Sequence, residues 1–393
     1  MVGVAAIARR PSPRITNEAP PHKIHRWFTP PGLTHLSKAG ILFTETLHTS
    51  PDTRRYTMKK GTKLGLLGLV AAGIGATTGG IAALNNYLYS KLIVPQERDP
   101  DELDDNDFQS QGRLWARAGE GFSSATIQAV DGPILWAGIV PAPEETHRWA
   151  ICLHGYRDTH ESMGAIAQLY HQAGWNVLLP DQRGHGRSEG EHVGWGYAER
   201  LDLLGWVNLI TRRDPDAQIV LHGTSMGGAT VLMSTGGALP RQVKAAVSDC
   251  AYTSFEAEFL QLLKNSTVEY THCSIPLPSA MIFSLLRRTT LRHAGYDLRD
   301  AAPIQAVAQS KTPTLFIHGV KDELIPGFMM GKLYQAARCP KSFLWMPEAG
   351  HARSVGTNPE LYWAAVSTFL EAYIHQDEES FDDDFDPAFA YED

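Results

Sequence analysis

The sequence contains few cysteines for its length, four in 393 residues. That number is too small for the disulfide framework that holds small secreted domains together. Cys152 and Cys250 stand inside or at the end of apolar stretches, which predicts buried free thiols. Cys273 and Cys339 could pair, but nothing in the sequence favours that pairing.

Three kinds of binding motif are also missing. No group of His and Cys has metal-ligand spacing, no glycine-rich loop has the pattern that cradles phosphates, and no stretch forms a strongly basic face. His160, His171 and His192 are scattered, and we expect them on the surface. The sequence therefore predicts an activity that needs no cofactor or metal, and it contains no indication of a nucleic-acid partner.

Basic residues are absent from the C-terminal end. Segment 376–393 carries nine acidic side chains and no Lys or Arg, in a chain whose net charge is −8. We expect this tail to be disordered and to be repelled by anionic surfaces. The acidic, polar stretch 96–107 is expected to be a linker.

Residues 64–84 lack charge altogether. An apolar helix of 21 residues is long enough to cross a bilayer core. A basic leader precedes this run and no small-x-small cleavage site follows it, so the sequence predicts an uncleaved membrane anchor within 58–95. Basic residues lie before the span and acidic residues after it, which by the positive-inside bias places the N-terminus in the cytoplasm and the remainder outside.

Residues 1–57 show no sustained apolar period and are interrupted by prolines. They are either a disordered cytoplasmic tail or an extension upstream of a true start at Met58. We favour the second interpretation, because a compact basic leader begins at Met58.

The folded domain is placed at residues 108–375. Asp131-Gly132 joins two extended runs, 123–130 and 134–140, in a predicted hairpin. Helical stretches then alternate with short apolar strands, which is typical of an α/β fold. The predicted strands are 149–153, 176–179, 217–221, 243–247, 313–319 and 343–347.

The stretch around Ser225 predicts a strand, a very tight turn and a helix. Gly223 and Gly227 flank the serine at the two positions where a side chain would collide if strand and helix approach closely. This G-x-S-x-G pattern is the nucleophile elbow. A serine hydroxyl becomes an effective nucleophile only when a histidine removes its proton and a carboxylate orients that histidine.

An acid and a base follow in the required order. Asp322 lies on the loop after the predicted strand 313–319, and His351 on the loop after the predicted strand 343–347. Asp249, after strand 243–247, is the alternative acid. The His-Gly-x-x-Asp-x-x-x-Pro pattern at 318–326 makes Asp322 the preferred assignment.

Over residues 108–375 these motifs resemble the α/β-hydrolases, in particular the lid-bearing serine esterases and the serine aminopeptidases. The resemblance implies a mostly parallel central sheet with flanking helices and a helical lid, for which we assign the insertion 251–310. It also implies an oxyanion hole built from the backbone N–H groups of Tyr156 and Met226. In the lid, an apolar face on Phe255, Phe259, Leu262 and Leu263 either lines an acyl pocket or covers the sheet.

In the loop 181–188, Asp181, Arg183 and His185 could be mistaken for a catalytic cluster. They precede the serine in sequence, and we interpret them as structural loop residues. His154, which also precedes the serine, is interpreted as a residue that braces its own loop rather than as the base.

The resulting hypothesis is a serine hydrolase that cleaves carboxylic esters with Ser225, His351 and Asp322. A serine peptidase with the same three residues is the alternative enzyme. A protein of the same fold that binds without turnover is the alternative from another class. The expected partners are a small ester or peptide substrate and a membrane, reached through one N-terminal helix.

Overall fold

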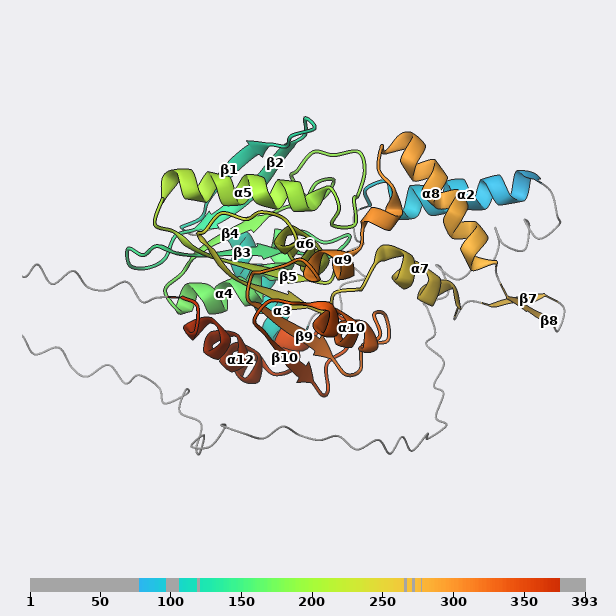
Figure 1. Ribbon diagram of the computed structural model, residues 1–393. Coiled ribbons are helices and arrows are strands. Elements are labelled where there is room, and N and C mark those ends of the chain that lie inside the picture. Colours follow the sequence, from blue (N-terminus) through green and yellow to red (C-terminus); the bar gives the residue numbers. More distant parts are fainter. Residues whose placement is uncertain are drawn as a thin grey trace, which may run out of the picture. The chain divides into compact units, whose positions relative to one another are not determined.

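The computed structural model describes residues 78–96, 106–118, 121–264, 267–270, 273–276 and 278–374. An eight-stranded sheet runs through them in the order β1-β2-β4-β3-β5-β6-β9-β10 (Figure 1). The strands β1 and β2 pair with each other and β2 pairs with β4 in antiparallel fashion, and all other neighbours are parallel. The bounds are β1 Ser123–Gln128, β2 Ile134–Val140, β3 Arg148–Leu153, β4 Asn176–Pro180, β5 Gln218–Thr224, β6 Val243–Asp249, β9 Thr314–Gly319 and β10 Lys341–Met346. The predicted α/β-hydrolase fold is confirmed.

Helices cover both faces of the sheet. On one face lie α4 (Gly164–Gln172) and α12 (Pro359–Glu371), and on the other α5 (Glu199–Arg213) and α6 (Met226–Thr235) (Figure 1). Successive residues of a strand point to opposite faces, so Ala150 and Cys152 of β3 join the core under α4, whereas Ile151 and Leu153 join the core under α5. Burial on both sides explains why the central strands are continuously apolar.

The antiparallel start of the sheet is the predicted hairpin. Its register runs from Ser123 opposite Ile139 to Gln128 opposite Ile134. Gly132 lies in the turn at φ +119°, a backbone conformation that side chains disfavour, which is the physical basis of the Asp-Gly turn signal.

An insertion separates β6 from β9. It contains α7 (Phe255–Lys264), a short hairpin of β7 (Thr267–Tyr270) and β8 (Cys273–Pro276), α8 (Ser279–His293), the 3-10 turn η3 (Leu298–Asp300) and α9 (Pro303–Val307). Helices were expected within 251–310, and the insertion contains them. The hairpin between them was not expected. After the insertion follow α10 (Phe328–Ala336) and α11 (Ser354–Thr357).

Helix α2 (Thr78–Leu92) packs against α8 and against the main domain. Asn85 Nδ2 donates a hydrogen bond to Thr289 Oγ1 at 2.7 Å, and the side chains of Leu88 and Ile93 are buried. The amide of Val193 donates to the carbonyl oxygen of Ile93 at 2.7 Å. The sequence had suggested no packing role for residues 85–95, because local hydropathy does not distinguish burial in lipid from burial in protein.

Within the described part of the chain, no helix combines the length and the apolar character needed to span a bilayer. Of the predicted span 64–84, only residues 78–84 are described, and they form the first half of α2. The predictions for 1–57, for 58–77, for nearly all of the linker 96–107 and for the tail 376–393 lie outside the described residues.

The cysteine prediction holds where it is tested. Cys152 and Cys250 are free and fully buried, and Cys339 is free and buried as well.

Candidate active site

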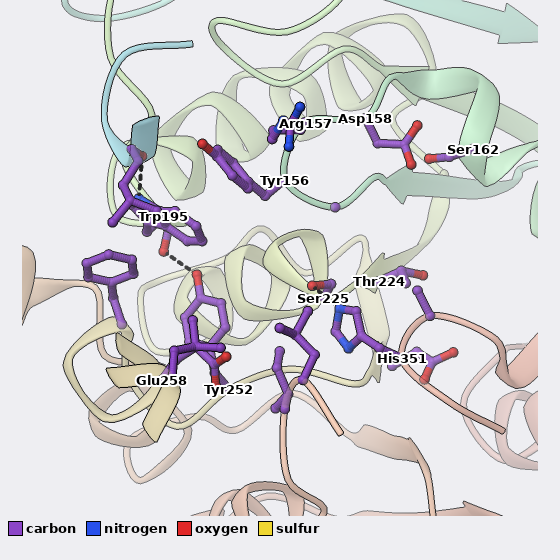
Figure 2. Close-up of a pocket in the computed structure, with 18 of the residues that line it drawn as sticks. Tyr156, Arg157, Asp158, Ser162, Trp195, Thr224, Ser225, Tyr252, Glu258 and His351 are labelled. Carbon is purple, nitrogen blue, oxygen red and sulfur yellow. Dashed lines mark hydrogen bonds between the residues drawn. The ribbon is translucent and has the colours of Figure 1, made fainter. Parts of the chain in front are cut away.

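Ser225 occupies the turn between β5 and α6. Its backbone has φ 56° and ψ −117°, a strained conformation for a residue with a side chain. The backbone holds the turn from both sides: the Ser225 amide donates to the carbonyl oxygen of Asp249 at 2.8 Å, and the Ala229 amide donates to the carbonyl oxygen of Ser225 at 2.9 Å. The serine side chain is thereby presented at the end of the strand (Figure 2).

The two flanking glycines make this turn sterically possible. A Cβ on Gly223 would lie 2.2 Å from the Gly227 carbonyl oxygen, and a Cβ on Gly227 would lie 2.1 Å from the Leu153 carbonyl oxygen. Both distances are far inside van der Waals contact with backbone atoms, which cannot move aside. The elbow prediction from these two glycines thus has a direct steric cause.

The side chains of Ser225, His351 and Asp322 form a hydrogen-bonded row. Ser225 Oγ lies 2.9 Å from His351 Nε2, and His351 Nδ1 lies 2.8 Å from Asp322 Oδ2. When Nδ1 carries the proton and donates a hydrogen bond to the carboxylate, Nε2 is left as an acceptor for the serine hydroxyl. The structure therefore brings together the three side chains singled out in the sequence.

Asp322 is fixed by its own loop. Its Oδ1 accepts hydrogen bonds from the amides of Leu324 (3.0 Å) and Ile325 (2.8 Å), which leaves Oδ2 for His351. His318 Nε2 lies 3.4 Å from Oδ2 and donates to the carbonyl oxygen of Ile325 at 2.8 Å. Burial lowers the pKa of His318, so this imidazole is neutral and acts as a brace for the loop.

Asp249, the alternative acid, has other partners. Ser354 Oγ donates to its Oδ1 at 2.9 Å, and burial raises the pKa of its carboxyl to about 6. Its backbone carbonyl holds the amide of Ser225. Asp249 thus braces the elbow while Asp322 holds the histidine.

The two backbone amides assigned to the oxyanion hole lie on the two segments beside Ser225. Met226 is the first residue of α6 and follows Ser225 directly. Gly155 packs so closely that a Cβ there would lie 3.4 Å from Ser225 Cβ, and Tyr156 follows it on the loop after β3. Gly155 and Tyr156 line the same pocket as the serine.

The loop residues that precede the serine are joined in a buried network. Asp181 Oδ1 accepts from the amide and from Nδ1 of His160, both at 2.8 Å. His154 Nε2 accepts from the Gln182 amide at 2.9 Å, and burial lowers its pKa. His160 was expected on the surface and is instead buried, because its imidazole satisfies the buried carboxylate. The structural interpretation of this loop agrees with these contacts.

Potential metal ligands come together at one place among the described residues. Side-chain atoms of Cys250, Asp322 and His351 lie within 4.8 Å of one another. The Asp322 and His351 atoms are already hydrogen-bonded to each other, and burial holds the pKa of the Cys250 thiol well above its usual range. A neutral thiol is a poor metal ligand, so this cluster does not fit a metal ion.

Ser225 and His351 line a pocket of about 790 Å³, a size typical of small-molecule sites (Figure 2). One wall is apolar and aromatic, and all four residues of the predicted apolar face on α7 belong to it together with Trp195. Another wall is polar and includes the ion pair of Arg113 with Asp158, at 3.1 Å.

Helix α2 supplies part of the pocket rim. Tyr87, Leu88, Lys91 and Leu92 line the cavity. Trp195 Nε1 donates a hydrogen bond to the Leu92 carbonyl oxygen at 2.9 Å. The hydroxyl of Tyr156 donates a hydrogen bond to the backbone carbonyl oxygen of Lys91. No pattern in the sequence had indicated this contribution.

Glu258 is a pocket residue that the sequence analysis missed. It lies on α7, lines the pocket and is only 5% exposed. A signal was present: Glu258 stands three residues after Phe255 and four before Leu262, which places it on the apolar face of the helix.

Comparisons with known proteins identify a matching family and several relatives. Residues 144–277 match the family described as serine aminopeptidase, S33. Over 232 residues the chain is 31% identical to an uncharacterized Bacillus subtilis protein, YqkD, an alignment that covers 58% of this chain and 73% of YqkD. An uncharacterized membrane protein of Saccharomyces cerevisiae is 28% identical over 210 residues, which cover 51% of this chain and 63% of that protein.

Among solved structures, an esterase from Pyrococcus furiosus has the same fold. It superposes with a TM-score of 0.52 at 19% sequence identity and covers 72% of this chain and 99% of the esterase chain.

Proposed function

We propose that this chain, which belongs to the same α/β-hydrolase family as YqkD, is a serine hydrolase that acts on carboxylic esters. The observation that carries this proposal is the hydrogen-bonded row from Ser225 through His351 to Asp322, placed on the wall of a pocket. A protein that only binds has no need of such a row.

The geometry supports an acyl-enzyme mechanism. His351 Nε2 takes the hydroxyl proton as Ser225 Oγ attacks the carbonyl carbon of the ester, and Asp322 stabilises the imidazolium that forms. The backbone N–H groups of Tyr156 and Met226 donate to the oxyanion, and each such donor typically lowers the barrier by about 2.7–4 kcal/mol. His351 gives this proton to the departing alcohol. In the second half of the reaction, His351 takes a proton from a water molecule, which attacks the acyl-enzyme, and returns that proton to Ser225 Oγ as the acid is released. These steps require no cofactor.

A serine peptidase is the second candidate, and the matched family description favours it. The same side chains cleave an amide when His351 protonates the departing amine. The two activities separate in one assay, in which p-nitrophenyl esters of increasing chain length are compared with amino-acyl amides. We expect higher kcat/KM for the esters and complete loss of both activities in Ser225→Ala. A preference for amides would establish the peptidase, and hydrolysis that persists in Ser225→Ala would contradict the proposed nucleophile.

For the insertion 251–310 we propose the role of a lid. Support comes from α7, whose residues Phe255, Phe259, Leu262 and Leu263 line the pocket that holds Ser225. Their apolar surface suits an acyl chain.

For residues 58–95 we propose a single-pass membrane anchor, with the hydrolase domain on the extracytoplasmic side. The uncharged run 64–84 and the basic residues before it support this. So does the description of the yeast relative as a membrane protein.

A further inference from the structure

One carboxyl group in the pocket, that of Glu258, has no role in the reaction described above. Glu258 projects from α7 into the cavity beside Tyr252, on a wall that Figure 2 shows apart from the Tyr156 loop. Only 5% of the residue is exposed, and its Oε2 atom is buried without a hydrogen-bond partner among the described residues. A buried polar atom left unsatisfied lowers the stability of the fold, so Glu258 Oε2 is suited to a partner that the described residues do not supply.

Glu256, two residues earlier on the same helix, shows the ordinary arrangement. Its carboxylate lies 3.4 Å from Arg299 Nε, is partly exposed and does not line the pocket. The two acidic residues therefore lie on opposite sides of one helix. Glu256 is paired on the surface, whereas Glu258 faces the cavity, and one of its carboxyl oxygens has no hydrogen-bond partner among the described residues.

We propose that Glu258 binds a neutral oxygen group of the substrate, so that the esters cleaved at Ser225 carry a hydroxyl or a second carbonyl on an otherwise apolar chain. This inference rests on the proposed serine hydrolase function and names its substrate class. The neighbouring wall residues Phe255, Phe259, Leu262 and Trp195 would contact the apolar remainder of such a substrate.

The surroundings of Glu258 favour a neutral partner over a cation. Burial, and to a lesser extent the carboxylate of Asp322, raise its pKa to about 8. The hydroxyl of Tyr252 lies beside it and is also buried, which raises the pKa of that hydroxyl well above its usual value. A carboxyl with a raised pKa is protonated below that value, so at neutral pH Glu258 is mostly protonated and can donate a hydrogen bond to an oxygen atom.

The test compares matched p-nitrophenyl esters: an unsubstituted medium-chain ester and its ω-hydroxy, ω-methoxycarbonyl and ω-amino derivatives. The comparison is repeated with the hydroxyl on the alcohol side, as a glycerol monoester against a propyl ester. Glu258→Leu removes the hydrogen-bonding group, and Glu258→Gln keeps a donor and an acceptor that do not ionise. Glu256→Leu is the control on the same helix.

We expect the wild-type protein to cleave an oxygen-bearing ester with a kcat/KM roughly tenfold above that of its unsubstituted counterpart, the value of one net hydrogen bond. The ratio should fall to about one in Glu258→Leu and persist in Glu258→Gln and Glu256→Leu. For the ω-methoxycarbonyl ester, the wild-type ratio should fall as the pH rises through about 8, because an ionised carboxylate cannot donate to a carbonyl. In Glu258→Gln the ratio should not change with pH. Each ratio compares two substrates on one variant, so a partial folding defect cancels.

Two results would overturn the inference while leaving the hydrolase function intact. One is equal ratios in the wild-type protein and Glu258→Leu, with the unsubstituted ester still hydrolysed at Ser225. The other is a wild-type preference for the ω-amino ester that is lost in Glu258→Gln, which would make Glu258 a cation site and favour an aminopeptidase. If an active-site serine probe does not label the wild-type protein at all, the hydrolase function and this inference both fail.

Discussion

Two aspartates lie at or just after the ends of neighbouring strands of the sheet, and their hydrogen bonds give them different roles. Asp322 follows β9 and accepts from two loop amides and from His351. Asp249 ends β6 and accepts from Ser354 instead. The choice between these residues depends on side-chain direction at the ends of two strands. The sequence supplied only a motif preference for Asp322.

We expect Asp322→Asn to lower kcat by roughly 10⁴-fold with the fold intact, because an amide in place of the carboxylate favours the wrong tautomer of His351. Steady-state ester hydrolysis, with circular dichroism as the folding check, measures this. Asp249→Asn is the matched control, and its kcat should change far less. The opposite ranking of the two variants would show that Asp249 is the acid.

At the scale of single elements, the strand β5, the turn and the helix α6 act as one unit. The turn closes only because positions 223 and 227 have no side chain. This steric requirement is local, which is why the sequence alone predicted the elbow.

Gly227→Ala should strongly destabilise the protein, by about 1–3 kcal/mol or more, because the new methyl group would overlap the Leu153 carbonyl oxygen. The free energy of unfolding from urea titration measures the effect. Gly331→Ala, within α10, is the control: nothing lies within 4 Å of the place that its methyl group would occupy, and alanine is the better helix former. It should be neutral or stabilising by up to about 1 kcal/mol. Equal stability of the two variants would contradict the steric account of the elbow.

Local sequence patterns predict some elements and miss others. The strands and the Asp131-Gly132 hairpin follow from local patterns, and the structure confirms them. The packing of α2 on α8, and its place on the pocket rim, join segments about 200 residues apart in sequence. No local signal specifies such a contact. The place of Glu258 is only partly predictable from the sequence. Helical spacing puts this residue on the apolar face of α7, but only the packing of the folded chain shows that this face lines the pocket.

At the scale of the whole molecule, the proposed anchor and the pocket share a helix. Residues 78–84 belong to the uncharged run and to α2, whose later residues line the cavity. If the anchor crosses the membrane as proposed, the pocket rim stands close to the bilayer surface and the substrate would be reached from that side.

If the basic residues before the proposed span hold the N-terminus inside, protease added to intact cells, after removal of any cell wall, should digest the domain beyond Glu97. Immunoblotting of the C-terminal part measures this, with a cytoplasmic protein as the protection control. Replacing Lys59, Lys60 and Lys63 with Glu should weaken the orientation. Full protection of the domain, with digestion only after lysis, would place the active site in the cytoplasm.

The central claim is that Ser225 is a nucleophile activated by His351, and covalent labelling tests it most directly. A fluorophosphonate probe reacts with a serine whose proton is removed by a neighbouring base. Peptide mapping by mass spectrometry should find the probe on Ser225 of the wild-type protein. Labelling should be lost in Ser225→Ala and strongly reduced in His351→Ala. Labelling that survives in Ser225→Ala, or a wild-type protein modified at another serine, would contradict the account.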